Sequence, residues 1–189
     1  MYDLPMRAPD RVQTTRLVMT APELGEAPEI FERYASDPEV TRFLGWPTHQ
    51  QVSDTEAFIG FSTSQWQREG MGAYLIRDRV DGKLLGSTGL GLAGQPSESH
   101  RAMTGYVLAQ DAWGLGYATE ALRSMVDVAR SIGIVSLSAL CHPEHRASAH
   151  VLEKCDFARD LRWVRKAVFP NLQAGQQDVW CFTLQIHPS

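Results

Sequence analysis

The stretch DAWGLGYATEALRSMVDVA, residues 111–129, places two glycines directly before a run that otherwise predicts a helix. After the glycines, apolar residues recur at helical spacing, at positions 118, 121, 122, 125, 126 and 129. Glycine within a helix is less favourable than alanine by about 1 kcal/mol. We therefore expect Gly114 and Gly116 to serve a purpose that needs a bare backbone at the start of this helix.

The composition predicts one ordinary globular domain over residues 1–189. Hydrophobic residues make up 43% and charged residues 21% of the chain, and the formal net charge is −4. This balance, without a block of Lys or Arg, argues against nucleic acid and against an anionic membrane surface as partners. No apolar run approaches the roughly 18 residues that span a bilayer. Three cysteines without paired spacing, and no evident signal peptide, predict free thiols in the cytoplasm.

Hydrophobic periodicity and turn residues predict the order strand, two helices, three strands, helix, strand, helix and two strands. This order indicates an α/β (α+β) fold, a mixed central sheet of about seven strands flanked by about four helices. Outside the quoted stretch, the expected elements are a strand over 14–23, helices over 29–37, 53–69 and 147–155, strands on both sides of residues 81–82, strands over 100–109 and 134–140, and two strands around 170–175.

Three local signals refine these expectations. Ser53 and Glu56 match a capping box, which predicts the start of the second helix. Asp81-Gly82 predicts a two-residue hairpin turn in which both residues have positive φ. Gly105 indicates a bulge or a close backbone approach within its strand.

Glycines at a helix start favour anion binding, because the first turn carries unbonded N–H groups and a partial positive charge. A P-loop would need a Lys followed by Ser or Thr after the glycines, and none stands there. A dinucleotide-binding turn would need a third glycine where Thr119 stands. A turn that only lets helix and strand pack closely is the structural alternative.

Residues 113–121, WGLGYATEA, resemble the acyl-CoA loop of the GNAT acetyltransferases. Gly116 and Ala118 match the family consensus, whereas Trp113 stands where the family has Arg or Gln. The residues YATEA are typical of the subgroup resembling RimJ and RimL, the acetyltransferases of ribosomal-protein N-termini. The resemblance implies that backbone amides of residues 113–118 hold the pyrophosphate of coenzyme A (CoA).

A second segment, HPEHRASAHVLEKCDF at 142–157, is similar to the next signature of this subgroup. Ser148 is among the matching residues, but His145 stands where the family has an Asn that contacts the cofactor. Histidine can donate or accept a hydrogen bond as asparagine does. Asp156 stands for a glycine after the helix, and Asp tolerates the left-handed conformation better than most residues. Looser matches extend the resemblance over about residues 12–185.

The resemblance implies acetyl-CoA as co-substrate and assigns roles to particular residues. Ser148 matches the position proposed to protonate the leaving thiolate, although a serine at a helix start also makes local backbone hydrogen bonds. The pantetheine arm would enter where strands part after Tyr106 and Cys141, with backbone amides near Val107 and Leu108 polarising the thioester carbonyl. The implied cofactor-binding residues are Tyr106, Val107, Leu108, Trp113, Gly114, Leu115, Gly116, Tyr117, Ala118, Thr119, His145 and Ser148.

The general base is less well defined by the sequence. Many relatives carry an acid two residues before the Gly-Tyr pair, where this chain has Met103. Glu98 and His100, just upstream, are the candidate bases, directly or through water, and a solvated loop is the alternative for both. An α-amine has a pKa near 8, against about 10.4 for a lysine side chain, so a weak base could suffice for a peptide N-terminus.

Other candidate sites are weaker. Cys141, His142, His145 and His150 lack the spacing of a metal site, and we expect no metal. Phe43, Trp46 and Trp66 are candidates for the wall of an acceptor pocket, with ordinary packing as the alternative.

The sequence thus predicts a cytoplasmic, acetyl-CoA-dependent N-acetyltransferase that acts directly on a primary amine, either a peptide N-terminus or a small molecule. The rival hypothesis is a non-catalytic CoA-binding or regulatory module with the same fold, and Met103 and His145 keep it open. The sequence does not identify the acceptor, and it leaves the oligomeric state open, a homodimer included.

Overall fold

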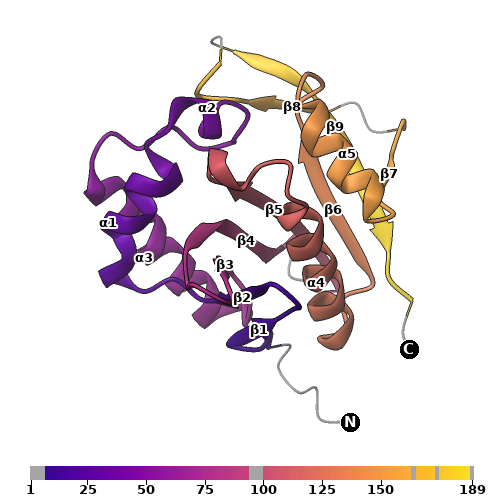
Figure 1. The fold of residues 1–189 in the computed structure, drawn as a ribbon. Coiled ribbons are helices and arrows are strands. Elements are labelled where there is room, and N and C mark those ends of the chain that lie inside the picture. The colour runs from indigo at the N-terminus through magenta and orange to yellow at the C-terminus, as the bar shows by residue number, and fades with distance from the viewer. Residues whose placement is uncertain (1–6, 94–99, 163–164, 173–174, 188–189) are drawn as a thin grey trace.

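A mixed sheet forms the middle of the molecule in the computed structural model, which describes residues 7–93, 100–162, 165–172 and 175–187 (Figure 1). The described strands follow the order β1-β2-β3-β4-β5-β6-β9-β7, and β8 pairs with β9 outside this path. Their bounds are β1 (Arg11–Gln13), β2 (Leu17–Thr20), β3 (Ala73–Asp78), β4 (Leu84–Leu92), β5 (Arg101–Leu108), β6 (Ser136–Cys141), β7 (Ala158–Arg159), β8 (Arg165–Val168) and β9 (Gln176–Gln185).

Helices cover both faces of this sheet: α4 and α5 lie on one face, and α1 and α3 lie on the other (Figure 1). Short 3-10 turns, η1 (Leu24–Glu26) and η4 (Gln110–Ala112), and a π-helical turn, η2 (Phe31–Ala35), complete the described helical elements. The α-helices are α1 (Ala27–Ile30), α2 (Pro38–Thr41), α3 (Val52–Glu69), α4 (Tyr117–Ser131) and α5 (Arg146–Lys154).

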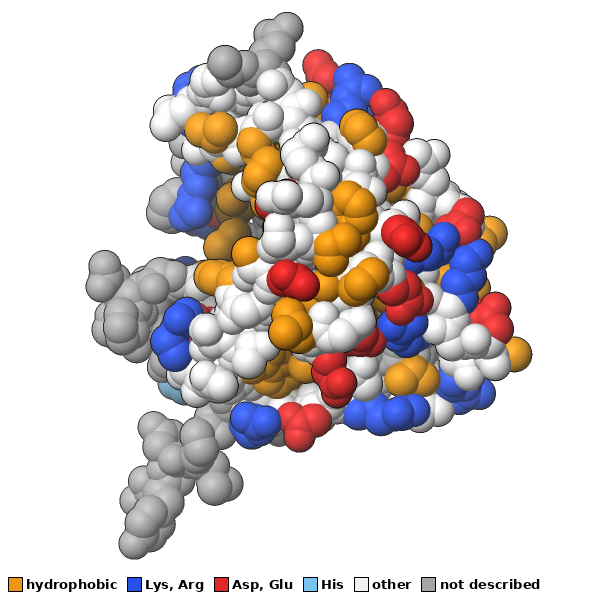
Figure 2. Space-filling view, turned by 90° about the vertical axis from the view of Figure 1, so that its left-hand side faces the viewer, with side chains coloured by type: hydrophobic (Ala, Val, Ile, Leu, Met, Phe, Trp, Pro, Cys, Tyr) orange, Lys and Arg blue, Asp and Glu red, His pale blue; other side chains and the backbone are white. Residues whose placement is uncertain are grey.

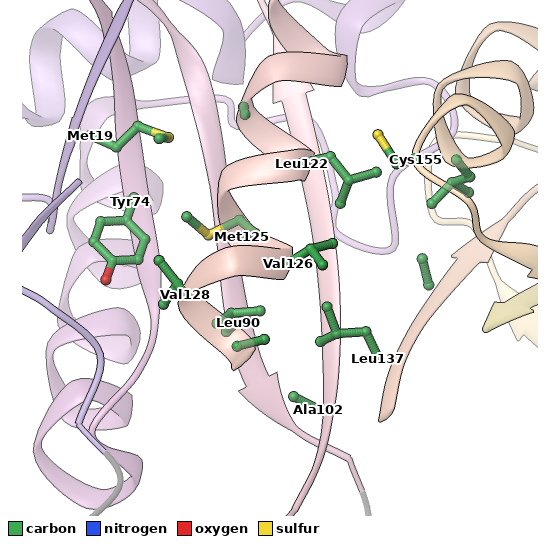
Figure 3. Close-up of a cluster of buried hydrophobic side chains, with 14 of the residues drawn as sticks. Met19, Tyr74, Leu90, Ala102, Leu122, Met125, Val126, Val128, Leu137 and Cys155 are labelled. Atoms are coloured by element: carbon green, nitrogen blue, oxygen red, sulfur yellow. The ribbon is translucent and has the colours of Figure 1, made fainter. Parts of the chain in front are cut away.

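Two hydrophobic cores lie on opposite faces of the sheet because successive strand residues point to opposite sides. On β3, Tyr74 and Ile76 belong to the larger core around α4, while Leu75 between them belongs to the smaller core under α1 and α3. Figure 3 shows Leu122 and Met125 of α4 within the larger core. The glycine-led helix is therefore anchored along its buried face, which fixes the position of its first turn.

Strands β5 and β6 form the one parallel pair in the described sheet, and they separate early. Their pairing joins Arg101–Met103 to Ser136–Ser138 and goes no further. The separation therefore begins after Met103 and Ser138, three residues earlier on each strand than the resemblance implied. Beyond this point the two strands part, and the gap leads toward the start of α5 (Figure 1).

The mixed α/β architecture predicted from the sequence is confirmed, with differences in its smaller elements. The expected first strand over 14–23 is the short hairpin β1–β2, and the sequence does not predict β7. Pro38, expected to stop a helix, also begins α2, with Asp37 as a cap that accepts hydrogen bonds from the Glu39 and Val40 amides. Proline suits the first helical position because its missing N–H would have no partner there.

The capping-box prediction was wrong by two positions. Helix α3 begins at Val52, and Gln51 and Asp54 form its capping box. Gln51 is still extended, with φ −152°, whereas Ser53 is already helical and cannot act as the cap.

Two turn and strand predictions also need correction. The hairpin at Asp81-Gly82 exists, but among its residues only Gly82 has positive φ (75°), and the loop between β3 and β4 covers residues 79–83. Gly105 pairs regularly with Gly89, and the bulge lies on β4 instead, at Leu85 opposite Ile76 and Arg77. The close backbone approach occurs at Gly86, where a Cβ would collide with the carbonyl oxygen of Val107.

Candidate acetyl-transfer site

The glycines before α4 adopt a backbone conformation that favours glycine. Gly114 has φ 74° and Gly116 has φ 82°, both in the left-handed region. The first hydrogen bond of the helix runs from the Glu120 amide to the Gly116 carbonyl, at 3.1 Å. The amides of residues 117–119 precede this bond and have no partner within the helix. The loop therefore presents a set of backbone donors at the positive end of a 15-residue helix.

Arg16, from the turn between β1 and β2, braces this loop. Its Nη1 donates to the Leu115 carbonyl (2.9 Å) and its Nε donates to Glu120 Oε2 (2.7 Å). The guanidinium also lies over the Tyr117 ring, 4.5 Å from its centre. One side chain thus ties the glycine loop, the first turn of α4 and the β1–β2 turn together.

Glu120 is the acidic partner in this brace. Burial raises its pKa, but the hydrogen bonds from Thr14 Oγ1 (2.6 Å) and from the Arg16 amide (2.9 Å) and guanidinium outweigh burial, so the pKa lies below its ordinary value. Glu120 is therefore a carboxylate near neutral pH. A negative charge in the first helical turn also stabilises the helix.

Charged and polar contacts also fix the segment before the glycines. Asp111 accepts hydrogen bonds from Arg33 Nη2 (2.9 Å) and Lys83 Nζ (2.7 Å), which lower its pKa to about 2. The Trp113 indole N–H donates to the Leu108 carbonyl at 2.8 Å, so this departure from the family consensus holds the loop to the end of β5. A hollow of about 710 Å³ adjoins Gly116 and is lined in part by Arg123 and Lys154.

A cavity of about 400 Å³ lies where β5 and β6 part. Strands β4 and β5 line one side, and β6 and α5 line another. The remaining wall comes from the segment between α2 and α3, from α3 itself and from the end of β8. Among the predicted cofactor-binding residues, those that line this cavity are Tyr106, Val107, His145 and Ser148.

Ser148, Tyr106 and Cys141 meet at the cavity wall. The Tyr106 hydroxyl lies 2.9 Å from Ser148 Oγ and 3.0 Å from the Ser148 carbonyl oxygen. Burial raises the pKa of Tyr106 and of the Cys141 thiol, so both keep their protons near neutral pH. The neutral phenol can donate to the Ser148 carbonyl or to Ser148 Oγ, and when it donates to Oγ the proton of the serine hydroxyl is left free.

Two imidazoles stack on Phe43 at the cavity. The Phe43 ring centre lies 5.1 Å from that of His142 and 4.8 Å from that of His145. Both nitrogens of His142 are engaged, since Nδ1 accepts from the Glu144 amide (3.2 Å) and Nε2 contacts Gln177 Oε1 (3.0 Å). For His145, burial first and the charge of His142 second lower the pKa. His145 is therefore a neutral imidazole at the cavity wall near pH 7.

The two candidate bases lie elsewhere or outside the description. His100 is exposed just before β5, with its Nδ1 3.2 Å from the Gly133 carbonyl oxygen, and it is not among the residues that line the cavity. Glu98 lies outside the described residues. Phe43 and Trp46 do line the cavity, whereas Trp66 packs edge-on against Tyr74 in the larger core.

Sequence reasoning missed two residues that organise this region. Arg16 braces the glycine loop from a turn about one hundred residues away in sequence, and Asn171 joins the turn after β8 to the segment between α2 and α3. Neither residue lies in a recognisable motif. No local signal could have found them, because both roles arise from contacts between distant segments.

Figure 2 shows the face that carries α1 and α3, where acidic and basic side chains are intermixed. Among the described residues, no three or more His, Cys, Asp or Glu side chains form a group that could hold a metal ion. No described helix is both long and apolar enough to cross a membrane.

Comparison with known proteins gives a consistent result. Residues 16–158 match the acetyltransferase (GNAT) domain family. The uncharacterised N-acetyltransferase p20 of Bacillus licheniformis is 27% identical over 178 residues, covering 93% of this chain and 96% of that protein.

Solved structures share the fold at lower sequence identity. RimL, the ribosomal L7/L12 alpha-N-protein acetyltransferase in complex with coenzyme A, superposes with a TM-score of 0.78 at 20% identity, covering 93% of this chain and 98% of that chain. The spermidine N-acetyltransferase of Vibrio cholerae, in complex with CoA and spermine, gives 0.74 at 15% identity, covering 91% and 96%. With its family match over most of its length, the chain belongs to the GNAT acetyltransferases and is an N-acetyltransferase.

Proposed function

We propose that this protein transfers the acetyl group of acetyl-CoA directly to a primary amine while both substrates are bound. The observation that carries this proposal is the pair of left-handed glycines at the start of α4, next to a cavity where β5 and β6 part. The arrangement offers backbone donors to a pyrophosphate and a gap for a linear arm. The relatives that bind CoA support the same choice of co-substrate.

The residues present fit the pyrophosphate and the pantetheine arm of CoA. Amides of residues 114–118 would bind the pyrophosphate, because two glycines leave them accessible and Arg16 holds their geometry, whereas the Trp113 amide already donates to the Gln110 carbonyl (3.1 Å). Amides near Val107 and Leu108 on β5 would bind the pantetheine and polarise the thioester carbonyl, where one preorganised donor contributes about 3 kcal/mol. His145 would replace the family asparagine as a polar contact. Acetyl-CoA would supply the activated acetyl group as a thioester.

Ser148 is the proposed proton donor to the leaving thiolate. Its hydroxyl lies 2.9 Å from the Tyr106 hydroxyl, which can hold it in one orientation. The amine loses a proton during the reaction, and this proton replaces the one that Ser148 donates. The reaction therefore releases a neutral thiol and an amide. A Ser148→Ala variant should lower kcat more than it weakens CoA binding.

The base that accepts the proton of the amine stays a prediction, with Glu98 and His100 as the candidates. His100 is exposed and outside the cavity lining, so a role for it would require water molecules between its ring and the amine. The low pKa of an α-amine reduces the demand on any base. The three free cysteines are all buried, and the cytoplasmic location stays a prediction.

The decisive experiment separates the enzyme from the binding module. The purified chain is incubated with acetyl-CoA and a panel of primary amines while thiol release is followed, and CoA affinity is measured by calorimetry. Amine-dependent thiol release supports the proposal. Tight CoA binding without release on any amine would favour the non-catalytic module.

A matched pair of glycine variants tests the loop. Gly116→Val should abolish measurable CoA binding, because the side chain would cover the donors and strain a residue at φ 82°. Gly133→Val is the control, since Gly133 has φ 81° at the other end of α4 and carries the same strain away from the loop. Equal CoA affinity in the two variants would contradict the proposed pyrophosphate site.

A further inference from the structure

We propose that the acceptor is a primary amine carried on an apolar or aromatic body, with no second charged group near it. This inference rests on the proposed acetyl transfer and specifies its substrate class. It depends on the cavity wall opposite the cofactor side, which is formed by the segment between α2 and α3, by α3 and by the end of β8.

Aromatic rings dominate this wall, and two of them contact the imidazoles of His142 and His145, which lie between β6 and α5 on the cofactor side. Phe43 stacks on His142 and His145, and His142 meets Phe169 edge-on with ring centres 4.9 Å apart. These rings come from three segments that are distant in sequence, so they form a continuous aromatic layer across the cavity. Trp46 and Phe58 extend the apolar surface around it. Such a layer favours the face or edge of a ring, or a branched aliphatic group.

The described residues that line the cavity include no Asp, Glu, Lys or Arg. Burying an ammonium without a carboxylate partner is unfavourable, and each further ammonium adds to this cost. Ring faces can attract one ammonium as it enters, which makes a single charge tolerable. A polyamine or an amino sugar would bring several charges into a cavity whose described lining offers none of the opposite sign. The lining therefore selects against such acceptors.

The same lining favours the reactive form of the amine. Removing an ammonium from water lowers its pKa, because burial disfavours the charged state. The neutral amine is the nucleophile in acetyl transfer. Met103 in the cavity lining carries no charge, so among the described lining residues it is desolvation, and no carboxylate, that favours the neutral amine.

Asn171 makes the aromatic wall rigid. Its Nδ2 donates to the carbonyls of Thr41 (2.7 Å) and Trp46 (2.9 Å), and its Oδ1 accepts from the Thr48 amide at 2.8 Å. These bonds hold the segment after α2 against the turn that follows Phe169. A wall fixed in advance binds a matching apolar group with less loss of conformational freedom.

The experiment compares kcat/KM across primary amines that differ in charge and in apolar surface. The panel contains 2-phenylethylamine, the dipeptides Phe-Ala and Asp-Ala as C-terminal amides, 1,5-diaminopentane and spermidine. We expect kcat/KM for 2-phenylethylamine and Phe-Ala to exceed kcat/KM for the diamine, spermidine and Asp-Ala by about tenfold or more. The two aromatic acceptors distinguish the two possible kinds of natural substrate. A preference for Phe-Ala indicates a peptide N-terminus, and a preference for 2-phenylethylamine indicates a small molecule.

A carboxylate placed in the cavity should reverse the preference. Met103→Glu should raise kcat/KM for 1,5-diaminopentane relative to 2-phenylethylamine by about tenfold, and the nearly isosteric Met103→Gln should leave the ratio close to that of the wild type. CoA affinity and thermal unfolding of both variants check that the fold is kept. Glu98→Gln in the wild-type background tests whether a carboxylate outside the described residues sets the selectivity.

The outcomes separate this inference from the proposed function. Thiol release with spermidine or the diamine at a rate equal to or above that with the aromatic amines would overturn the inference and leave acetyl transfer intact. A wild-type preference for aromatic amines that Glu98→Gln abolishes would also overturn it, because selectivity would then come from that carboxylate. No thiol release with any amine would overturn the proposed function itself.

Discussion

The glycine loop is held by charged groups near the surface, whereas the acceptor wall of the cavity is held by stacked rings and one half-buried amide side chain. Arg16 and Glu120 brace the loop through hydrogen bonds at 2.7 and 2.9 Å. Across the cavity, Phe43 stacks on two imidazoles and Asn171 ties two segments together. The two sides therefore respond to different changes: the first to charge, the second to packing and hydrogen bonding.

This contrast follows from what each side is proposed to bind. A pyrophosphate carries charge and needs donors at fixed positions, so the loop depends on backbone geometry that a few exposed contacts can hold. An apolar amine needs a dry wall of complementary shape. Substitutions that affect one side only can test whether the two are independent, since distant sites without shared partners have additive effects.

The largest effect is expected from the core behind the glycine loop. Leu122 is fully buried in α4 at the centre of the larger core (Figure 3), and Leu122→Ala should lower the free energy of unfolding by about 2–5 kcal/mol. Chemical denaturation measures this loss. Val80→Ala is the control, since Val80 is 93% exposed and its truncation should change stability by less than about 0.5 kcal/mol. A loss in both variants of similar size would contradict the assigned core.

Asn171→Ala should affect the acceptor side alone. It leaves the Thr48 amide and the carbonyls of Thr41 and Trp46 without their partner, at a cost of about 1–3 kcal/mol. We expect KM for the amine to rise while CoA affinity stays at the wild-type value. Asn171→Asp keeps the acceptor for the Thr48 amide but turns a carboxylate oxygen toward the carbonyls of Thr41 and Trp46, so its KM should rise at least as far as that of Asn171→Ala. An equal loss of CoA affinity would show that the two sides are coupled.

The sequence was most informative where a single conformation or a short-range pattern decides the structure. Gly114 and Gly116 were expected to need a bare backbone, and both have positive φ. Asp156 was expected to tolerate the left-handed region in place of a glycine, and its φ is 64°. The helical spacing of apolar residues after Gly116 predicted α4, because each such requirement is local to the residues that show it.

The acceptor wall was harder to predict because its parts come from distant segments. Phe43 and Trp46 were identified as candidates together with Trp66, and only packing in three dimensions separates them: Trp66 donates its indole N–H to the Ala73 carbonyl and lies in the core. The partner of Asn171 is more than one hundred residues away in sequence. The early separation of β5 and β6 likewise depends on the register between strands joined by α4, which no local pattern encodes.

Arg16→Met tests the charged brace of the loop. The variant keeps an unbranched side chain but loses the bonds to Glu120 and to the Leu115 carbonyl, so the loop should sample more conformations. We expect the Kd for CoA to rise roughly three- to tenfold with little change in Tm, because exposed ion pairs contribute little to stability. Arg130→Met, which breaks the exposed pair with Asp127 on the same helix, is the control. Unchanged CoA affinity in Arg16→Met would remove Arg16 from the site.

The smallest effect concerns His145 and pH. Burial, and then the charge of His142, lowers the pKa of His145 below its ordinary 6.5, so the ring stays neutral to lower pH in the folded protein than in the unfolded chain. Between the two pKa values the unfolded chain binds more protons, and stability should therefore fall as pH falls below 6.5.

His145→Asn introduces the family residue, which cannot titrate. This variant should be less sensitive to acid than the wild type while its CoA affinity is preserved. His150→Asn, at an exposed position of α5, should keep the wild-type dependence on pH. Half-buried His49, whose pKa burial also lowers, contributes to the acid sensitivity that remains in both variants. Melting curves and CoA titrations from neutral to mildly acidic pH measure both properties. If His145→Asn melts with the wild-type pH dependence but loses CoA affinity, the imidazole contributes a contact that asparagine cannot replace, and the cofactor side of the cavity then depends on a residue foreign to the family motif.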